Sequence, residues 1–253
     1  MNSVRRYEAI MEQLLSKREV TVAELSEQLQ VTGKTIREDL AKLEEKGLLH
    51  RVHGGALLAH SDQLGLLTPK GPVTPHAAEK SAIAAMAVSM IEPYEVIALD
   101  VGSTTLEIAR QLENRPQTVV TNDIHIISEL ASKEQIRLVV PGGYRVRNML
   151  AGPESVEFVR KLNIHKAFLS ATGIHTDYGF TIYTGELMEM KRALLEASRT
   201  SYVAAAHHKF GQSALLTYAQ FPEIEAVLTD SGIASETEAA YRSSGLNIQV
   251  APK

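Results

Sequence analysis

Apolar residues recur at helical spacing in three segments near the start of the chain, residues 4–17, 22–29 and 33–46. Thr21 and Thr32 directly precede the second and third segments, where a hydroxyl can accept hydrogen bonds from the free amides of the first turn. A short helix, a turn of a few residues and a longer helix form the helix-turn-helix plan. The pattern therefore predicts a small helical head.

Residues 48–56 follow the third segment, alternate between apolar and polar, and end in two glycines. They predict a two-stranded hairpin, a wing suited to phosphate or to a minor groove. Each helix alone fits an ordinary three-helix bundle, but the four elements in this order favour DNA binding, with the exposed front of the third helix in a major groove. The residues predicted to meet DNA are Thr32, Gly33, Lys34, Thr35, Arg37, Glu38, Lys42, Arg51 and His53.

Charge along the chain neither supports nor opposes DNA binding. Residues 1–60 hold nine Lys or Arg and nine Asp or Glu, and the whole chain has a formal charge of −4. Because there is no general basic field, the cations that matter must be local, and they include Arg5 and Arg6. Such a protein needs two heads, and so a dimer, for useful affinity at cellular salt.

The composition is that of an ordinary globular protein of 253 residues, enough for a small head and one α/β domain. No apolar run can span a bilayer and no apolar signal core follows the amino terminus, so we expect a cytoplasmic protein with no membrane partner. Cysteine is absent and the nine histidines do not gather at metal spacing, so we expect neither a metal nor a cofactor. His207 and His208 are interpreted as a solvated pair.

Ser, Gly, Thr and Pro break the pattern over residues 58–76, which we interpret as a linker between a head of residues 1–57 and a second domain of residues 77–253. In the second domain, helix and strand signals alternate, which predicts a mostly parallel sheet with helices on both faces. The predicted strands are residues 96–99, 118–120, 137–140, 167–170, 202–206, 226–228 and 248–250. The predicted helices are residues 79–91, 105–112, 124–132, 186–198 and 236–243.

Small, polar or cationic residues follow five successive predicted strands of this domain. Ligands of such sheets bind beyond the carboxyl ends of the strands, so these loops predict a pocket for a small anionic ligand. Any one loop alone fits plain turn chemistry. The residues predicted to bind this ligand are Asp100, Gly102, Ser103, Thr104, Thr105, Thr121, Asn122, Gly142, Gly143, Lys191 and Lys209.

Several motifs occur in a fixed order along the chain: residues 32–40, 50–56, 99–105, 120–122, 141–143 and 209–211. Together they resemble the DeoR family of bacterial sugar-operon regulators, over nearly the whole chain. The resemblance implies an N-terminal winged helix-turn-helix domain and a Rossmann-like α/β sensor domain, similar to ribose-5-phosphate isomerase and glucosamine-6-phosphate deaminase. It also implies a phosphorylated sugar as effector, repression of a carbohydrate-catabolic operon that the effector relieves, and a homodimer or homotetramer.

Three positions depart from the pattern of this family. Glu38 stands where a second arginine is common in the recognition helix, and a carboxylate there can accept a hydrogen bond from cytosine N4. Ala206 stands where many members have Asp, and Leu187 where many have Glu four residues before a helical lysine. The first departure predicts a shifted operator preference, and the other two concern the identity of the effector.

In the binding hypothesis, the effector phosphate lies on the amides and hydroxyls of residues 102–105, with charge from Lys191 or Lys209. Asp100 is expected to accept hydrogen bonds from sugar hydroxyls. Binding then shifts the sensor domains relative to the heads and weakens operator affinity, which requires that the effector bind the two states with different affinity.

The main alternative is an enzyme that isomerises, deaminates or hydrolyses a sugar phosphate behind a DNA-binding head. Proton transfer needs a carboxylate or histidine next to the substrate carbon. Asp100, Glu186 and His207 are candidates, but no pattern in the sequence pairs any of them with a partner. The head favours sensing over turnover, so we expect no catalytic residues. A DNA binder without an effector is a third interpretation, which the polar strand ends disfavour.

Overall fold

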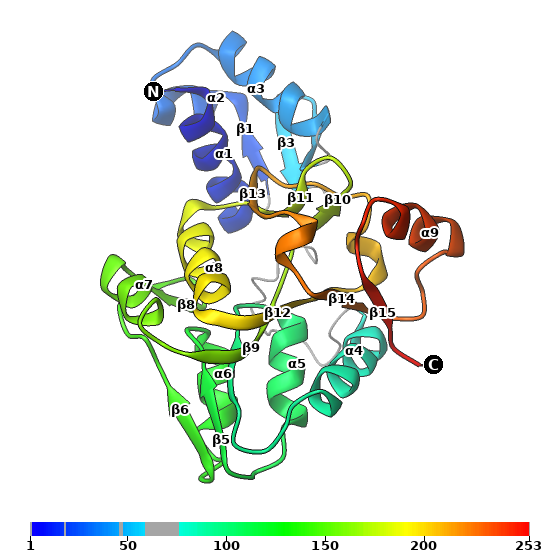
Figure 1. Ribbon diagram of the computed structural model, residues 1–253. Helices are drawn as coiled ribbons and strands as arrows, with labels where there is room; N and C mark the ends of the chain where they lie inside the picture. Colours follow the sequence, from blue (N-terminus) through cyan, green and yellow to red (C-terminus); the bar gives the residue numbers. More distant parts are fainter. Residues whose placement is uncertain (1, 18, 46–47, 59–75, 253) are drawn as a thin grey trace.

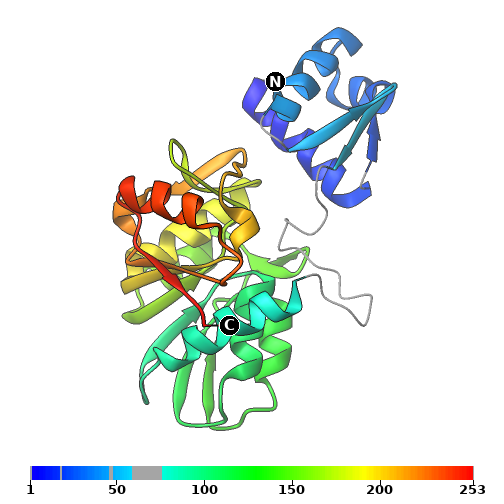
Figure 2. The same cartoon turned by 90° about the vertical axis from the view of Figure 1, so that its right-hand side faces the viewer.

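The computed structural model describes residues 2–17, 19–45, 48–58 and 76–252 (Figure 1). They form two lobes, a small head and a larger α/β domain (Figure 2). The predicted linker, residues 58–76, falls almost entirely on positions outside the described residues. Its first residue, Leu58, still belongs to a strand of the head.

The head contains the three predicted helices and the predicted wing, together with one strand that the sequence did not suggest. Residues 16–20 read as a break, but a short strand here pairs antiparallel with the second strand of the wing, giving a three-stranded sheet of order β1-β3-β2. This strand is too short to show a period, and it exists because of a partner more than thirty residues away. The elements are α1 (Ser3–Lys17), β1 (Glu19–Thr21), α2 (Val22–Leu29), α3 (Gly33–Glu45), β2 (Leu49–Val52) and β3 (Gly55–Leu58).

Threonine caps fix the starts of α2 and α3 as the sequence predicts. The Thr21 hydroxyl accepts a hydrogen bond from the Glu24 amide at 3.2 Å, and the Glu24 carboxylate accepts one from the Thr21 amide. Thr32 Oγ1 accepts the Thr35 amide at 3.2 Å. The predicted inner residues of α3, among them Ile36 and Leu40, are buried in the core of the head.

The sequence suggested that Arg6 contributes to DNA binding, but its side chain is paired within the head. Its Nε lies 2.6 Å and its Nη2 3.0 Å from the two carboxylate oxygens of Asp39 in α3, so the pair is bidentate. The two side chains are only 13% and 4% exposed. Arg6 therefore ties α1 to α3, and its charge is matched within the head.

Seven parallel strands form the central sheet of the larger domain, in the order β15-β14-β12-β9-β4-β5-β6. They are β4 (Val96–Leu99), β5 (Gln117–Val120), β6 (Ile136–Val139), β9 (Ile164–Leu169), β12 (Ser198–Ala204), β14 (Ala226–Thr229) and β15 (Ile248–Val250). Each predicted strand is present, shifted by at most a few residues.

Helices cover both faces of this sheet, as predicted. On one face, α4 (Ala77–Ser89), α5 (Ser103–Gln111) and α6 (Ile124–Leu130) share an apolar core with residues of the sheet. The apolar core of the other face includes residues of α8 (Gly185–Ala197) and α9 (Ser235–Ser243). Among the described residues, no helix is long and apolar enough to cross a membrane.

Several short elements lie where no element was predicted. A hairpin joins β7 (Tyr144–Val146) to β8 (Met149–Ala151) and leads into the short helix α7 (Pro153–Val159). A separate antiparallel sheet contains β10 (Gly173–His175), β11 (Gly179–Ile182) and β13 (Leu216–Ala219). These strands have three or four residues each, too few to show alternation against the surrounding turns.

The order of the strands reverses between β4 and β9, which lie side by side at the centre of the sheet. From β4 the chain continues outward through β5 and β6, and from β9 it continues in the opposite direction through β12. The loops that follow β4 and β9 therefore diverge and leave a crevice at the carboxyl ends of the strands, where ligands of such sheets bind.

Candidate functional site

The exposed face of α3 carries most of the residues predicted to meet DNA. Lys34, Arg37, Glu38 and Lys42 are exposed and follow one another at helical spacing, so they form a single stripe. Thr32 is exposed at the cap. Thr35 and Gly33 are half-buried, because the Thr35 hydroxyl lies 3.0 Å from that of Thr32 and the glycine packs close to Val22 of α2.

The wing presents its two predicted residues differently. His53 is exposed at the turn between β2 and β3. Arg51 is exposed too, but its backbone amide donates to Glu44 Oε1 at 2.8 Å and its Nε lies 3.8 Å from Glu44 Oε2. This contact holds the wing against α3 and offsets part of the charge of Arg51.

A cavity occupies the crevice between the loops that follow β4 and β9. Its lining combines backbone and hydroxyl groups at the start of α5, three lysines, one histidine and a wall of small apolar side chains. No carboxylate belongs to this lining among the residues that the structure describes. The lining residues are Lys80, Val101, Gly102, Ser103, Thr104, Ser170, Ala171, Thr172, Ile182, Leu187, Lys191, Ala204, Ala205, Ala206, His208 and Lys209.

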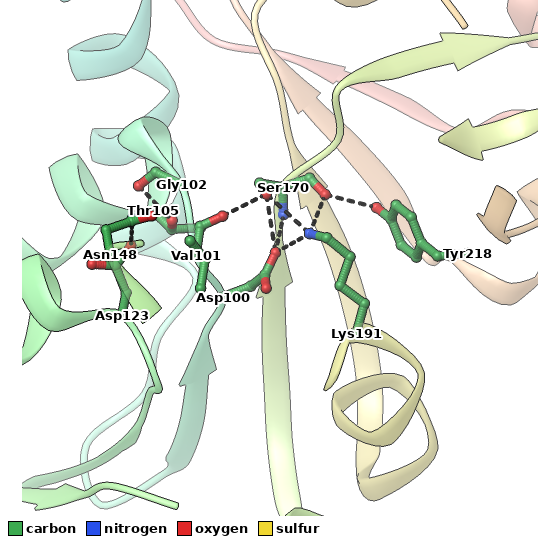
Figure 3. Close-up of polar contacts among 9 residues, drawn as sticks. All are labelled: Asp100, Val101, Gly102, Thr105, Asp123, Asn148, Ser170, Lys191 and Tyr218. Carbon is green, nitrogen blue, oxygen red and sulfur yellow. Dashed lines mark hydrogen bonds and ion pairs between the residues drawn. The ribbon is translucent and has the colours of Figure 1, made fainter. Parts of the chain in front are cut away.

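Lys191 and Asp100 form a buried ion pair at the base of this cavity (Figure 3). Both side chains are 1% exposed. The ammonium group also donates to the Ser170 carbonyl at 2.7 Å and lies 5.0 Å from the centre of the Tyr218 ring, whose hydroxyl donates to the same carbonyl. Burial lowers the pKa of Lys191, and the charge of Asp100 opposes that shift.

Asp100 does not face the cavity as a free acceptor of sugar hydroxyls. Its Oδ2 accepts hydrogen bonds from Lys191 and from both the amide and the hydroxyl of Ser170, at 2.9 and 3.0 Å from Ser170. Its Oδ1 is buried without a hydrogen-bond partner. The carboxylate thus lies beneath the lining and orients Lys191 and the loop after β9.

The remaining predicted residues divide into two groups. Gly102, Ser103, Thr104, Lys191 and Lys209 line the cavity. Thr105 is buried, and its hydroxyl donates to the Gly102 carbonyl at 2.9 Å within the first turn of α5.

Besides Asp100 and Thr105, four further predicted residues do not line the cavity. The Thr121 hydroxyl accepts the Asp123 amide at 3.2 Å, and the Asn122 side chain donates to the Leu150 carbonyl at 2.9 Å. Gly142 and Gly143 have positive φ angles of 81° and 103°, and a Cβ at Gly143 would lie 2.3 Å from a backbone oxygen. These residues shape the β7–β8 hairpin and its surroundings.

Asp123 follows β5 and lies close to Gly102, at the start of the predicted phosphate-binding residues 102–105. It was not among the residues predicted to bind the effector. It caps α6 and accepts a hydrogen bond from the Asn148 side chain at 3.1 Å (Figure 3). Burial raises the pKa of Asp123, while hydrogen bonds from backbone amides, including that of Gly102, oppose the shift. A buried carboxylate one loop away therefore lies close to the backbone of Gly102.

Lys80 and His208 also line the cavity, and the sequence did not identify them. Lys80 lies in the first part of α4, where it resembles any surface lysine of an amphipathic helix. The interpretation of His207 and His208 as a solvated pair is wrong. His207 Nδ1 lies 2.7 Å from Asp230 Oδ2, and the ring of His208 stacks on that of His76 with centroids 4.3 Å apart.

His208 makes the stability of the protein depend on pH. Burial, reinforced by nearby cations such as Lys209, lowers the pKa of His208 to about 4 from its ordinary 6.5. Between these values the unfolded chain binds a proton that the folded protein does not, so stability falls as the pH drops from 6.5 towards 4. We expect His208→Asn to lose less stability than the parent protein between pH 7 and pH 5 in urea titrations. Equal losses would contradict this role.

Comparison with known proteins supports the DNA-binding head and the second domain separately. Residues 6–62 match the DeoR-like helix-turn-helix domain, and residues 75–231 match the DeoR C terminal sensor domain. The HTH-type transcriptional regulator IolR of Bacillus subtilis is 32% identical over 234 residues, covering 91% of this chain and 92% of IolR. The transcriptional repressor AccR of Agrobacterium fabrum is 33% identical over 235 residues, covering 90% of this chain and 89% of AccR.

Among solved structures, ribose 5-phosphate isomerase A of Methanocaldococcus jannaschii matches with a TM-score of 0.41 and 17% identity, over 53% of this chain and 55% of the isomerase. The two family matches and the regulators aligned along nine-tenths of the chain agree with the winged head and the α/β domain described above. The chain belongs to the DeoR family of DNA-binding transcription regulators and is not an enzyme.

Proposed function

We propose that the protein represses a carbohydrate-catabolic operon and that a phosphorylated sugar, bound in the cavity of the α/β domain, releases it from the operator. The observation that carries this proposal is the cavity lining, which among the described residues holds no carboxylate and three lysines, one of them, Lys191, paired with Asp100 beneath the lining. Such a lining favours an anion, and its position beyond the carboxyl ends of parallel strands is typical of sugar and nucleotide phosphates. The name of AccR as a repressor supports the direction of control.

In the proposed complex, the phosphate lies against the start of α5. Ser103 and Thr104 offer hydroxyls and free backbone amides there, and the partial positive charge of the helix start favours an anion. Lys209, which follows β12, lines the same cavity. The apolar wall of Ala204, Ala205 and Ala206 leaves room for a compact sugar backbone.

The proposed assembly is a cytoplasmic homodimer or homotetramer. The stripe on α3 offers few cations, and its Glu38 repels phosphate, so one head binds DNA weakly. Two heads joined by the α/β domains contact two half-sites and raise the affinity through effective concentration.

Thermal unfolding with a panel of phosphorylated pentoses and hexoses tests the effector. We expect at least one phosphorylated sugar to raise the melting temperature, by an amount that corresponds to about 2.7 kcal/mol at a hundredfold excess over Kd. The matching unphosphorylated sugar and inorganic phosphate alone are expected to have little effect. Lys209→Gln should weaken binding at least tenfold, whereas Lys161→Gln, on an exposed position away from the cavity, should not.

The same sugar must also weaken binding to DNA. Fragments selected from genomic DNA by the protein supply a binding site for gel-shift titration with and without the sugar. If no phosphorylated sugar changes either melting or DNA affinity, the effector proposal fails. Conversion of a sugar phosphate, followed by NMR, would contradict sensing without turnover.

A further inference from the structure

The head touches the α/β domain through helix α1, which lies beside the β11 and β13 region in Figure 1. Tyr183, directly after β11, is only 5% exposed, and it belongs to the same apolar cluster as Tyr7, Ile10 and Met11 of α1. Ala214 of the α/β domain belongs to this cluster too. An aromatic side chain of the sensor thus completes the apolar core of the head.

Three charged residues meet beside this apolar contact. Glu12 of α1, Arg147 between β7 and β8, and Glu186 of α8 line one small cavity. Burial and the charge of Glu186 raise the pKa of Glu12, and the charge of Arg147 opposes this shift. Arg147 therefore lies close enough to a carboxylate of the head and to a carboxylate of the sensor for their charges to interact.

The segment from Ile182 to Leu187, which contacts the head, also contributes to the lining of the effector cavity. Ile182 and Leu187 line that cavity, and the residues between them, from Tyr183 to Glu186, face the head. Leu187 lines both cavities. Lys191 follows one turn later on α8. A ligand that moves the start of α8 must therefore act on the surface under α1.

A second connection runs through the β7–β8 hairpin. Asn148, the neighbour of Arg147, donates a hydrogen bond to Asp123, whose carboxylate lies near enough to the backbone of Gly102 for that backbone to lower its pKa. The Ile124 amide also donates to the Asn148 carbonyl at 2.8 Å. The hairpin that carries Arg147 is thus joined by hydrogen bonds to the loop after β5 and the start of α6, and Asp123 of that loop lies close to Gly102.

We infer that Tyr183 and Arg147 are positioning residues for the DNA-binding head, forming a docking surface for helix α1 of their own chain through which the effector acts on DNA affinity. The docking is independent of the effector, whereas its control by the effector rests on the proposed function. Helix α3 lies on the side of the head away from the α/β domain in Figure 1, so the docked head keeps its exposed stripe open.

The absence of cysteine from the chain allows a direct test of docking. A Cβ at Gly185 would lie 3.8 Å from Glu8 Oε1 of α1, so Glu8→Cys and Gly185→Cys place two thiols across the contact. With a short bismaleimide, we expect rapid cross-linking within one chain. The control pair, Glu8→Cys with Glu113→Cys at the opposite end of the sheet, should react far more slowly. Equal rates for the two pairs, or a product only between two chains, would overturn docking within the chain.

Two variants test control by the effector, with DNA fragments and a phosphorylated sugar selected on the parent protein. Tyr183→Ala and Arg147→Glu should bind the sugar with an affinity within about twofold of that of the parent protein. In the parent protein, we expect the sugar to change DNA affinity by about fivefold or more, and both variants should lose most of this change. Tyr94→Ala and Arg199→Glu, on exposed positions elsewhere, should respond normally.

The charge swap Glu12→Arg with Arg147→Glu guards against damage to the fold, because it restores opposite charges and should recover the response. A normal response in both single variants would overturn the proposal. If the parent protein binds no sugar phosphate, the proposed function fails, and with it control by the effector, while the cross-linking result still decides docking.

Discussion

Lys191→Met is expected to lower the free energy of unfolding of the α/β domain by about 3–5 kcal/mol at pH 7 and to remove the response to the effector. The variant leaves the Asp100 carboxylate without its cation at 1% exposure, with Oδ1 already lacking a partner. Ser170 alone donates to Oδ2 and cannot balance a full charge. Urea unfolding followed by circular dichroism measures the loss.

The double variant Asp100→Asn with Lys191→Met separates stability from function. Both charges are then absent, so no buried charge lacks a partner, and most of the lost stability should return. Effector binding should not return, because Lys191 also lines the cavity. A loss below about 1 kcal/mol in the single variant would show that water or a neighbouring group already compensates Asp100.

Arg37→Ala removes specific DNA binding while leaving the fold intact. Arg37 is exposed on α3 and lies on the stripe with Lys34 and Glu38, so its loss disturbs no buried contact. An arginine that reads a guanine edge contributes about 1–3 kcal/mol, and the proposed dimer loses two of them, about 2–6 kcal/mol in total. Gel-shift titration against competitor DNA measures the loss, and normal operator binding by the variant would mean that α3 enters the groove by another face.

Glu38→Arg is the companion to this experiment, with an effect of the opposite sign. It replaces a repelling carboxylate with a cation, so nonspecific affinity should rise and the dependence on salt should steepen. Glu236→Arg on α9 makes the same change in net charge far from the stripe and serves as the control. If both variants change the salt dependence equally, total charge rather than the position of Glu38 controls it.

Local patterns in the sequence predicted the long elements well. The caps at Thr21 and Thr32, the helical spacing in α3 and the apolar runs of the seven parallel strands each depend on neighbours within a few residues. The strands β1 and β13 pair with strands more than thirty residues away, whereas β7–β8 and β10–β11 are local hairpins that the pattern did not reveal. The two long-range pairings were therefore not predictable from local pattern.

The candidate site was predictable in part for a related reason. Strand ends pointed to Gly102, Ser103 and Lys209, which line one cavity, since parallel strands bring their carboxyl ends to one edge. The sequence could not show that Asp100 turns inward to Lys191, 91 positions away, or that Lys80 faces the same cavity. Side-chain direction at a strand end or on a helix depends on packing that no local pattern records.

The bidentate pair between Arg6 and Asp39 holds α1 and α3 together, so the head moves as one rigid body. Because α1 contacts the α/β domain, a small rotation at that contact rotates α3 through the same angle. In a dimer, two such rotations change the distance between the two α3 helices, which must match half-sites about 34 Å apart. Operators with one base pair added or removed between half-sites would therefore measure the rotation. The half-site spacing that gives the highest affinity should change when the ligand is present.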